Sequence, residues 1–282
     1  MHQKVVPFLS FLFLLLFVFA QDFFGQELRG TIDSIEAELP HLGPSQRLDA
    51  LSAICNVATT LNDASYEQAC LRRLFEEADA QGATNIAGYA YANLICSFYN
   101  YNMFDELLAE FPKTLAYQER VGNYIYYYEE WQLLIDMYLH LEKNYEALSE
   151  LQRMHDDAKR RNNALGQATA LAKMGEAFGM IYRDFEAAAE NYTRAIELFS
   201  QMEYVSGQEL NSYFEYTYLL YQMRQWDELR KTARLWKKRL DKIHKEQDKD
   251  LTSITMREFY YYSMALIVES EQKNFKEAEK HI

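Results

Sequence analysis

The residues of this chain that could carry chemistry are its carboxylates and its six histidines. Adjacent carboxylates can share acid–base work, and two such pairs occur, Glu129-Glu130 and Asp156-Asp157. We interpret both pairs as surface charges rather than as a catalytic dyad. Five of the histidines are isolated and lack His-Glu-x-x-His or other metal-ligand spacing: His41, His140, His155, His244 and His281. The sequence therefore predicts that the chain is not an enzyme, with no catalytic residue, no metal and no cofactor.

The charge balance argues against nucleic acid as a partner. The formal net charge is −13, whereas a phosphate-binding surface needs clustered Lys and Arg. Residues 230–249 form one locally basic stretch, but Asp and Glu are interleaved with its Lys and Arg. This mixed pattern predicts a solvated helix face.

The first 20 residues have the pattern of a targeting segment. Lys4 precedes an apolar run over residues 5–20, and Val18-Phe19-Ala20 matches the small-x-small cleavage pattern. The run is shorter than the about 20 residues that a membrane span needs. We expect a signal peptide and an exported protein, on the periplasmic or extracytoplasmic side of a membrane. The alternative is an uncleaved N-terminal anchor. Membrane contact is expected only through that anchor or through sequence beyond Ile282.

The chain has three cysteines, Cys55, Cys70 and Cys96. An odd and small number does not form a disulfide framework. All three fall in expected helices, where Cys commonly packs as a small hydrophobic residue. A bridge between Cys55 and Cys70 stays open, because an exported protein meets an oxidising compartment.

A short motif, an aromatic residue followed by a small or aliphatic one, recurs about every 40 residues. Its small or aliphatic positions are separated by 38, 40, 41, 41 and 49 residues, at Ala69, Leu107, Ala147, Ala188, Leu229 and Ala278. The aromatic positions are Tyr66, Phe104, Tyr145, Phe185, Trp226 and Phe275. A fixed period of this length indicates one supersecondary unit that is copied and stacked.

The unit over residues 168–200 shows what is repeated. One apolar stripe at helical spacing consists of Leu171, Met174, Phe178 and Ile181. A turn is expected around residues 182–184, before a second stripe formed by Phe185, Ala188, Tyr192, Ala195 and Ile196. Gly175 lies beside the first stripe, where a missing side chain lets a second helix approach closely. The pattern predicts a helical hairpin that needs a neighbouring copy to bury both of its faces.

This unit resembles a tetratricopeptide repeat (TPR), and looser copies extend over about residues 50–282. The residues that occupy signature positions of the motif are Leu171, Met174, Gly175, Phe178, Phe185, Ala188, Tyr192 and Ala195. The resemblance implies an all-α fold, a right-handed α-solenoid of stacked antiparallel helix pairs. The spacing exceeds the 34 residues of the ordinary motif, so we expect longer helices.

The same reading predicts three segments along the chain. Residues 1–20 are the signal peptide, and residues 21–47 are a lead-in or capping helix with a linker. Residues 48–282 form the repeat domain, with about five full units and a truncated sixth. The absence of a polar capping helix leads us to expect that the natural protein continues past Ile282.

In tetratricopeptide arrays the first helices line a concave groove. By resemblance, the corresponding ligand-groove residues are Tyr89, Asn93, Tyr99, Asn100, Glu129, Gln132, Asp136, Lys173, Glu176, Asn211, Phe214, Tyr218 and Tyr221. Lys173 is the one basic residue of this set, and Glu215 adds a further acid, so like charge disfavours an acidic peptide tail. A basic or neutral peptide, or a sugar stacked on Tyr rings, suits such a surface. The alternative is that these are ordinary solvated residues.

The favoured interpretation is an exported scaffold that binds a protein or peptide. It is similar to the extracytoplasmic repeat region of bacterial TPR-containing signalling proteins, in which a membrane helix and an output module follow. The alternative is a stand-alone periplasmic or secreted adaptor protein. A carbohydrate-binding or enzymatic protein is the least supported class.

Overall fold

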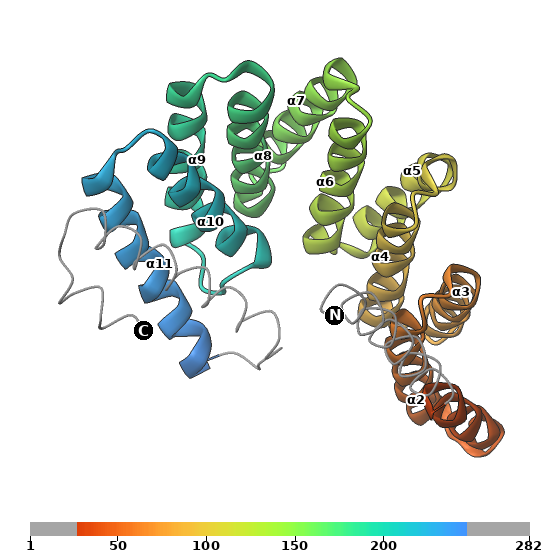
Figure 1. Cartoon of the computed structure of the whole chain (residues 1–282). Helices are drawn as coiled ribbons and strands as arrows, with labels where there is room; N and C mark the ends of the chain where they lie inside the picture. Colours follow the sequence, from red (N-terminus) through yellow and green to blue (C-terminus); the bar gives the residue numbers. More distant parts are fainter. Residues whose placement is uncertain (1–26, 247–282) are drawn as a thin grey trace, which may run out of the picture. The chain divides into compact units, whose positions relative to one another are not determined.

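The structure is a computed structural model that describes residues 27–246, except for the side chains of residues 243–246. Over these residues the chain is helical and contains no strand (Figure 1). The expected signal peptide, the repeat copy at Phe275 and His281 lie outside the described residues, as does the side chain of His244. Among the described residues, no helix combines the length and the apolar character that a membrane crossing requires.

The chain divides into two compact units, residues 1–130 and residues 131–282, and the division falls inside helix α6 (Tyr124–His140). The first unit begins with a helix over residues 27–38, within the segment in which a lead-in helix is expected. It continues through η1 (Leu39–His41), α2 (Pro44–Ala58), η2 (Thr59–Leu61), α3 (Ala64–Ala80), α4 (Thr84–Asn100), α5 (Phe104–Val121) and the start of α6. Because α2 starts at Pro44, it begins before the predicted start of the repeat domain at residue 48.

The second unit continues the same pattern of consecutive helices. After the end of α6 it contains α7 (Asn144–Arg160), α8 (Ala164–Ala177), the π-helical turn η3 (Phe178–Tyr182), α9 (Phe185–Ser200), α10 (Gly207–Gln222) and α11 (Trp226–Glu246). From α2 to α5 and from α7 to α11, each helix packs against the next one along the chain. The all-α fold of sequence-adjacent helix pairs is confirmed.

The period is more regular than the sequence motif indicates. The first helices of the pairs begin at residues 44, 84, 124, 164 and 207, and the second helices begin at residues 64, 104, 144, 185 and 226. A helix of about 17 residues and a short turn therefore fill half of a 40-residue unit. This confirms the expectation of helices longer than those of a 34-residue repeat.

One of the predicted anchor positions is wrong. Leu107, Ala147, Ala188 and Leu229 are fully buried at the fourth position of their helices, but Ala69 is exposed. The equivalent position of α3 is Glu67, which is 6% exposed and accepts a hydrogen bond from the Tyr101 hydroxyl at 3.2 Å. Because Glu67 occupies the position that is apolar in the other second helices, the apolar pattern aligns α3 two residues out of register. The correct interval to Leu107 is the regular 40 residues rather than 38.

The turns also repeat, through residues in the left-handed backbone conformation. Turns within pairs place positive φ angles at Asn62, Asn102, Glu142, Arg183 and Arg224, and turns between pairs place them at Gly82, Gly122 and Asn162. Most of these turns are closed by a backbone hydrogen bond that spans five residues, such as Met103 N to Phe98 O at 2.8 Å. This bond is the helix-ending pattern that favours Gly and Asn.

Three charged residues that we expected on the surface are buried. Glu130 is 0% exposed and Asp157 is 5% exposed, so neither carboxylate pair is purely a surface feature. Within the basic stretch, Arg239 is 9% exposed and binds Glu209 through two hydrogen bonds of 2.5 and 2.8 Å. Each of the three has side-chain partners in the fold, which a count of charges cannot reveal.

The three cysteines are free thiols, so the structure contains no bridge between Cys55 and Cys70. Both of these thiols are buried, and burial raises the pKa of Cys55 to about 12. Their role in this structure is packing, as expected for helical cysteines.

Candidate functional site

The candidate site is a pocket in the second unit, of about 400 Å³, between α8, η3, α9 and α10. Its lining is formed by Gly175, Glu176, Gly179, Met180, Arg183, Phe185, Tyr192, Phe214, Glu215, Tyr218, Leu219 and Gln222. Three of the predicted groove residues, Glu176, Phe214 and Tyr218, are among them. A mostly apolar hollow of this size with a few polar groups is typical of sites for small ligands or single side chains.

The π-helical turn shapes one side of this pocket. Asp184 N donates to Phe178 O at 3.1 Å, across six residues instead of the five that close the other turns. The hairpin therefore holds one extra residue, and α9 starts 21 residues after α8 instead of the 20 that separate α4 and α5. Met180 is 64% exposed, and Arg183 ends the turn with φ +55°. Such π-turns occur frequently at functional sites.

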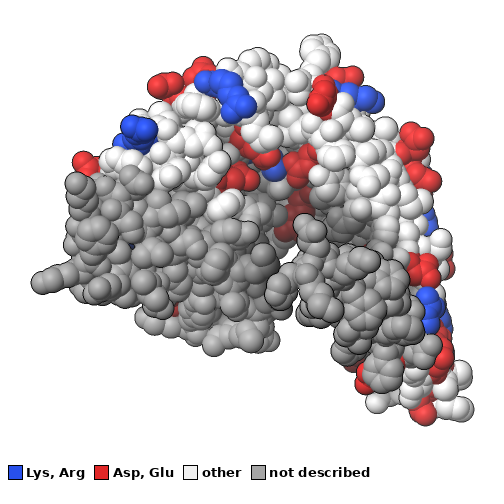
Figure 2. All heavy atoms as spheres, in the orientation of Figure 1, with Lys and Arg blue, Asp and Glu red and all other residues white. Residues whose placement is uncertain are grey.

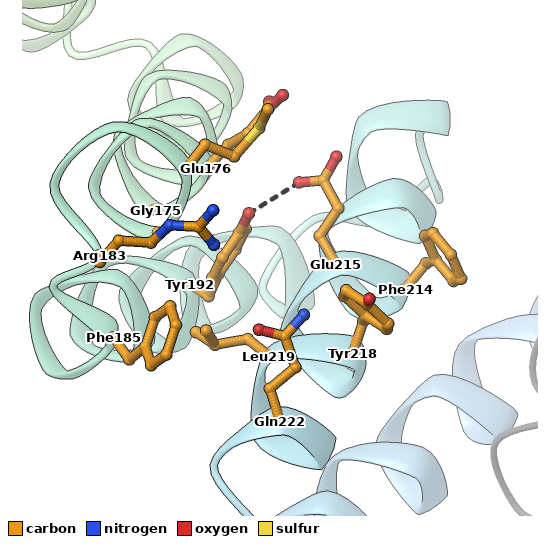
Figure 3. Close-up of a pocket in the computed structure, with 12 residues that line it drawn as sticks. Gly175, Glu176, Arg183, Phe185, Tyr192, Phe214, Glu215, Tyr218, Leu219 and Gln222 are labelled. Atoms are coloured by element: carbon orange, nitrogen blue, oxygen red, sulfur yellow. Dashed lines mark hydrogen bonds between the residues drawn. The ribbon is translucent and has the colours of Figure 1, made fainter.

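Gly175 and Tyr192 form the floor of the pocket. A Cβ atom on Gly175 would lie 2.9 Å from the Tyr192 ring, which confirms that Gly175 permits close approach of the second helix. The Tyr192 hydroxyl donates to Glu215 Oε2 at 3.0 Å (Figure 3). Figure 3 shows Tyr192 and Glu215 facing each other, with the guanidinium of Arg183 directed toward the Tyr192 ring.

An acidic cluster with one lysine lies beside this floor. Lys173 Nζ lies 2.7 Å from Asp136 Oδ1 and 2.6 Å from Glu176 Oε2. Burial raises the pKa of Glu215 to about 7, and Glu176 adds to the rise. Burial also raises the pKa of Asp136, whereas Asp136 and Glu176 outweigh burial and raise the pKa of Lys173. Three carboxyl groups thus share a single buried ammonium group.

The other predicted groove residues of the second unit lie near this cluster, with one exception. Gln132, Lys173 and Asn211 line a small adjoining cavity of about 30 Å³, together with Glu215. That volume corresponds to about one water molecule. Tyr221 is not part of either lining and packs its ring against Trp226, with centroids 5.8 Å apart.

The predicted groove residues of the first unit are divided between a cavity and ring contacts. Asn93 and Asn100 line a polar cavity of about 320 Å³, together with Thr59, Asn62, Glu67, Cys96, Ser97 and Tyr101. Tyr89 and Tyr99 lie outside its lining and contact the rings of Tyr126 and Phe104. Glu129 is half-buried beside Glu130. None of the thirteen predicted groove residues is fully buried.

Sequence reasoning missed most of the pocket's lining from η3 and α9. The sequence pattern predicts an ordinary turn at Arg183 and places Phe185 and Tyr192 in the apolar stripe of the second helix. The interval between Ala147 and Ala188 is 41 residues, one more than the regular period, but the next interval, from Ala188 to Leu229, has the same length and so nothing singles out this hairpin. Nothing in the sequence placed that extra residue in a π-turn.

The arrangement is suited to binding. The pocket lining combines aromatic rings with two carboxyl groups and one guanidinium, and it contains no Ser, Thr, Cys or His side chain to serve as a nucleophile or imidazole base. Within the part of the chain that the structure describes, no group of three or more His, Cys, Asp or Glu side chains is arranged to hold a metal ion.

Comparison with solved structures identifies the fold. The chain is similar to BtubC (BKLC) from P. vanneervenii, with 15% identity and a TM-score of 0.58 over 78% of this chain and 89% of that one. It is also similar to NprR in complex with its cognate peptide NprX, with 14% identity and a TM-score of 0.54 over 100% of this chain and 76% of that one. The apo form of the quorum sensor NprR from B. thuringiensis gives 13% identity and a TM-score of 0.51 over 100% and 81%.

No protein-family model matches the chain, and no curated protein matches it significantly. The structural similarity, at such low sequence identity, establishes architecture alone. Together with the 40-residue register of helix pairs, it shows that the chain has the fold of a TPR-type repeat protein.

Proposed function

We propose that the chain is a peptide- or protein-binding repeat scaffold and that the pocket between α8, η3, α9 and α10 receives a side chain of the bound segment. The observation that supports this most directly is the pocket itself, about 400 Å³ with mostly apolar walls. Its rim exposes Met180 at 64% and Tyr218 at 49%, and the neighbouring Tyr182 is 54% exposed. Exposed apolar side chains grouped around a hollow are typical of interaction sites. NprR, which shares the fold, was solved with a bound peptide.

A random heptapeptide display library, selected on the purified chain, tests this proposal. The wild-type chain is expected to enrich a peptide consensus. Phe214→Ala combined with Tyr218→Ala removes two aromatic walls and should lose that consensus. Tyr145→Ala is the matched control, because Tyr145 is 83% exposed on α7 and outside the pocket lining. Failure to enrich any consensus on the wild-type chain would reject peptide binding.

We further propose that the protein is exported and is the extracytoplasmic sensor part of a longer bacterial signalling protein. The support is the apolar segment over residues 5–20 with its cleavage pattern, together with the repeat fold. Cell fractionation with mass spectrometry of the mature N-terminus tests export, which predicts a chain that starts at Gln21. An intact Met1 on a cytoplasmic protein would contradict it.

The alternative is a stand-alone periplasmic or secreted adaptor protein. Reading the coding sequence beyond Ile282 separates the two. An apolar span of about 20 residues followed by a kinase or DNA-binding pattern supports the sensor. A polar capping helix followed by a stop codon supports the adaptor.

A further inference from the structure

Around the pocket of the second unit, carboxyl groups outnumber the ammonium group beside them, and this imbalance affects which ligand charge the pocket favours. Asp136, Glu176 and Glu215 supply three carboxyl groups, whereas Lys173 supplies one buried ammonium group. Lys173 is already paired with Asp136 and Glu176 at 2.7 and 2.6 Å. On the face drawn in Figure 2, acidic atoms gather near α8 with little blue beside them.

Glu215 is the carboxyl group of the three that forms no ion pair with Lys173, although it lies within the electrostatic field of that ammonium group. It accepts a hydrogen bond from the Tyr192 hydroxyl at 3.0 Å, and no Lys or Arg of the described residues lies within ion-pair distance of it. It lies at the junction of the pocket and the small adjoining cavity, because it lines both. A half-buried carboxylate in this position has no positive charge paired with it. A cation that enters the pocket would supply that positive charge.

The remaining walls suit the aliphatic or planar part of a basic side chain. Phe185 and Leu219 line one side, and Phe214 and Tyr218 project from α10 (Figure 3). Long basic side chains bury their methylene stems against apolar surface, and aromatic rings also attract cations. Apolar walls with an acid at the end therefore match Lys or Arg better than they match a purely apolar residue.

We propose that this pocket accepts a Lys or Arg side chain of the bound peptide, with Glu215 as the partner of its positive charge. This inference rests on the proposed peptide-binding function and specifies the chemistry of its ligand. Arg183 lines the same pocket with the opposite sign, so it weakens cation binding and would strengthen anion binding. Removing Arg183 and removing Glu215 are therefore expected to have opposite effects on the binding of a cation and on the binding of an anion.

Protonation of Glu215 makes the binding depend on pH. The groups that face it are Glu176 and Lys173 from α8, Asp136 from α6 and Tyr192 from α9, with Arg183 lining the same pocket. The pKa of Glu215 is about 7, so this group is mostly protonated at pH 6 and mostly ionised at pH 8. Lys and Arg stay charged over this range. A basic peptide is therefore expected to bind about tenfold more tightly at pH 8 than at pH 6.

The first arm of the test compares peptides selected from the heptapeptide library by four proteins: wild type, Glu215→Gln, Arg183→Ala and Tyr145→Ala. Wild type and Tyr145→Ala should enrich Lys or Arg at one peptide position. Glu215→Gln should lose this enrichment, although its amide oxygen can still accept from Tyr192. Arg183→Ala should retain or sharpen it. Thermal unfolding confirms that each variant is folded.

The second arm measures the affinity of one selected synthetic peptide by fluorescence polarisation at pH 6 and pH 8. Glu215→Gln is expected to weaken binding at pH 8 by about tenfold or more and to abolish the pH dependence. A peptide with norleucine in place of the basic residue should bind the wild-type protein with no gain at pH 8.

Three results would overturn the inference while leaving peptide binding intact. One is enrichment of Asp or Glu that Arg183→Ala removes, which means that the pocket takes an anion. Another is a consensus without a charged position. The third is a basic consensus that Glu215→Gln leaves unchanged, which places the cation elsewhere. If no consensus appears on the wild-type chain, the proposed function itself fails.

Discussion

At the scale of single residues, the contact between Gly175 and the Tyr192 ring sets the geometry of the pocket floor. Any Cβ atom at Gly175 would lie within 3.0 Å of three atoms of that ring. The same ring carries the hydroxyl that reaches Glu215. A single missing side chain therefore fixes both the approach of α9 to α8 and the position of the polar contact.

Gly175→Ala is expected to lower the free energy of unfolding by up to about 2 kcal/mol, because the new methyl group overpacks the contact at a cost of about 1–3 kcal/mol. The gain of about 1 kcal/mol that Ala brings to a helix interior offsets part of that cost. Gly179→Ala is the matched control, since its added methyl would meet Ala188 Cβ at an ordinary 3.7 Å. Urea unfolding of the two variants measures the difference. If Gly175→Ala proves as stable as Gly179→Ala, the close contact is not real.

Glu130 shows how a buried carboxyl group is retained without a cation in its immediate contacts. It accepts hydrogen bonds from Thr114 Oγ1 and Gln118 Nε2, both at 2.7 Å. Burial nevertheless raises its pKa from 4.5 to about 8. The folded chain therefore keeps this proton to a higher pH than the unfolded chain does.

The stabilising effect of this proton is fully present below about pH 4.5 and is lost as the pH rises to about 8. Glu130→Gln should remove this loss, so the variant should gain stability relative to wild type with rising pH, on the order of 4 kcal/mol in total. Chemical unfolding at pH 5, 7 and 9 measures the gain. Glu129→Gln, at the half-buried neighbour, is the control and should change stability little. A constant difference between Glu130→Gln and wild type across these pH values would contradict the assignment.

At the scale of elements, the turns repeat with the same 40-residue spacing as the helices that they connect. A residue in the left-handed conformation recurs at 40-residue spacing at Asn62, Asn102 and Glu142. In this conformation the Cβ of any residue but Gly crowds the backbone, and Asn tolerates it because its short polar side chain can form local hydrogen bonds, which Glu does not do. The left-handed conformation of Glu142 therefore costs conformational free energy.

Glu142→Gly should raise the free energy of unfolding by about 1 kcal/mol, since Gly has no Cβ to strain at φ +55°. Glu146→Gly, four residues later in the first turn of α7, is the matched control. It should lower stability by up to about 1 kcal/mol because Gly is unfavourable in a helix. Thermal unfolding of both variants is sufficient. Shifts of the same sign would show that the turn is not strained.

Arg239 ties α11 to α10, to the end of α9 and to the loop between these two helices. Besides Glu209, it donates to the carbonyl oxygens of Phe199 at 3.3 Å and Tyr204 at 3.2 Å. Its position in a basic stretch gave no indication of this role. The structure instead places it among acceptors that only a guanidinium can reach together.

Arg239→Ala is expected to lower the free energy of unfolding by about 3–5 kcal/mol, because Glu209 is 0% exposed and would lose its cation. The exposed neighbour Lys238 provides the control, and Lys238→Ala should change stability by less than about 0.5 kcal/mol. Combining Arg239→Leu with Glu209→Leu should recover much of the loss. Urea unfolding measures all three variants. A loss below about 1 kcal/mol for Arg239→Ala would mean that the pair is not buried.

At the scale of the whole molecule, the sequence was sufficient for the repeat architecture, because stacked helix pairs need apolar anchors at regular intervals. Leu107, Ala147, Ala188 and Leu229 are fully buried as predicted. The register failed at α3, where the buried Glu67 stands in place of an apolar anchor. A pattern of apolar residues cannot report a position at which a carboxyl group is buried by its partners.

The site was less accessible to sequence reasoning than the fold. Of the predicted groove residues, Glu176, Phe214 and Tyr218 line the pocket, because the first helices do carry part of it. The other part comes from the π-turn and the start of α9, which depend on one extra residue in a single hairpin. The π-turn occurs in one copy of the repeat, so it cannot be predicted from the apolar pattern that the copies have in common.

The most direct test of the account is a crystal structure of the chain with a peptide selected from the display library. A basic side chain of the peptide is expected to enter between Phe185 and Tyr218 and to end within ion-pair distance of Glu215. A peptide bound to another surface, with this pocket left empty, would contradict it.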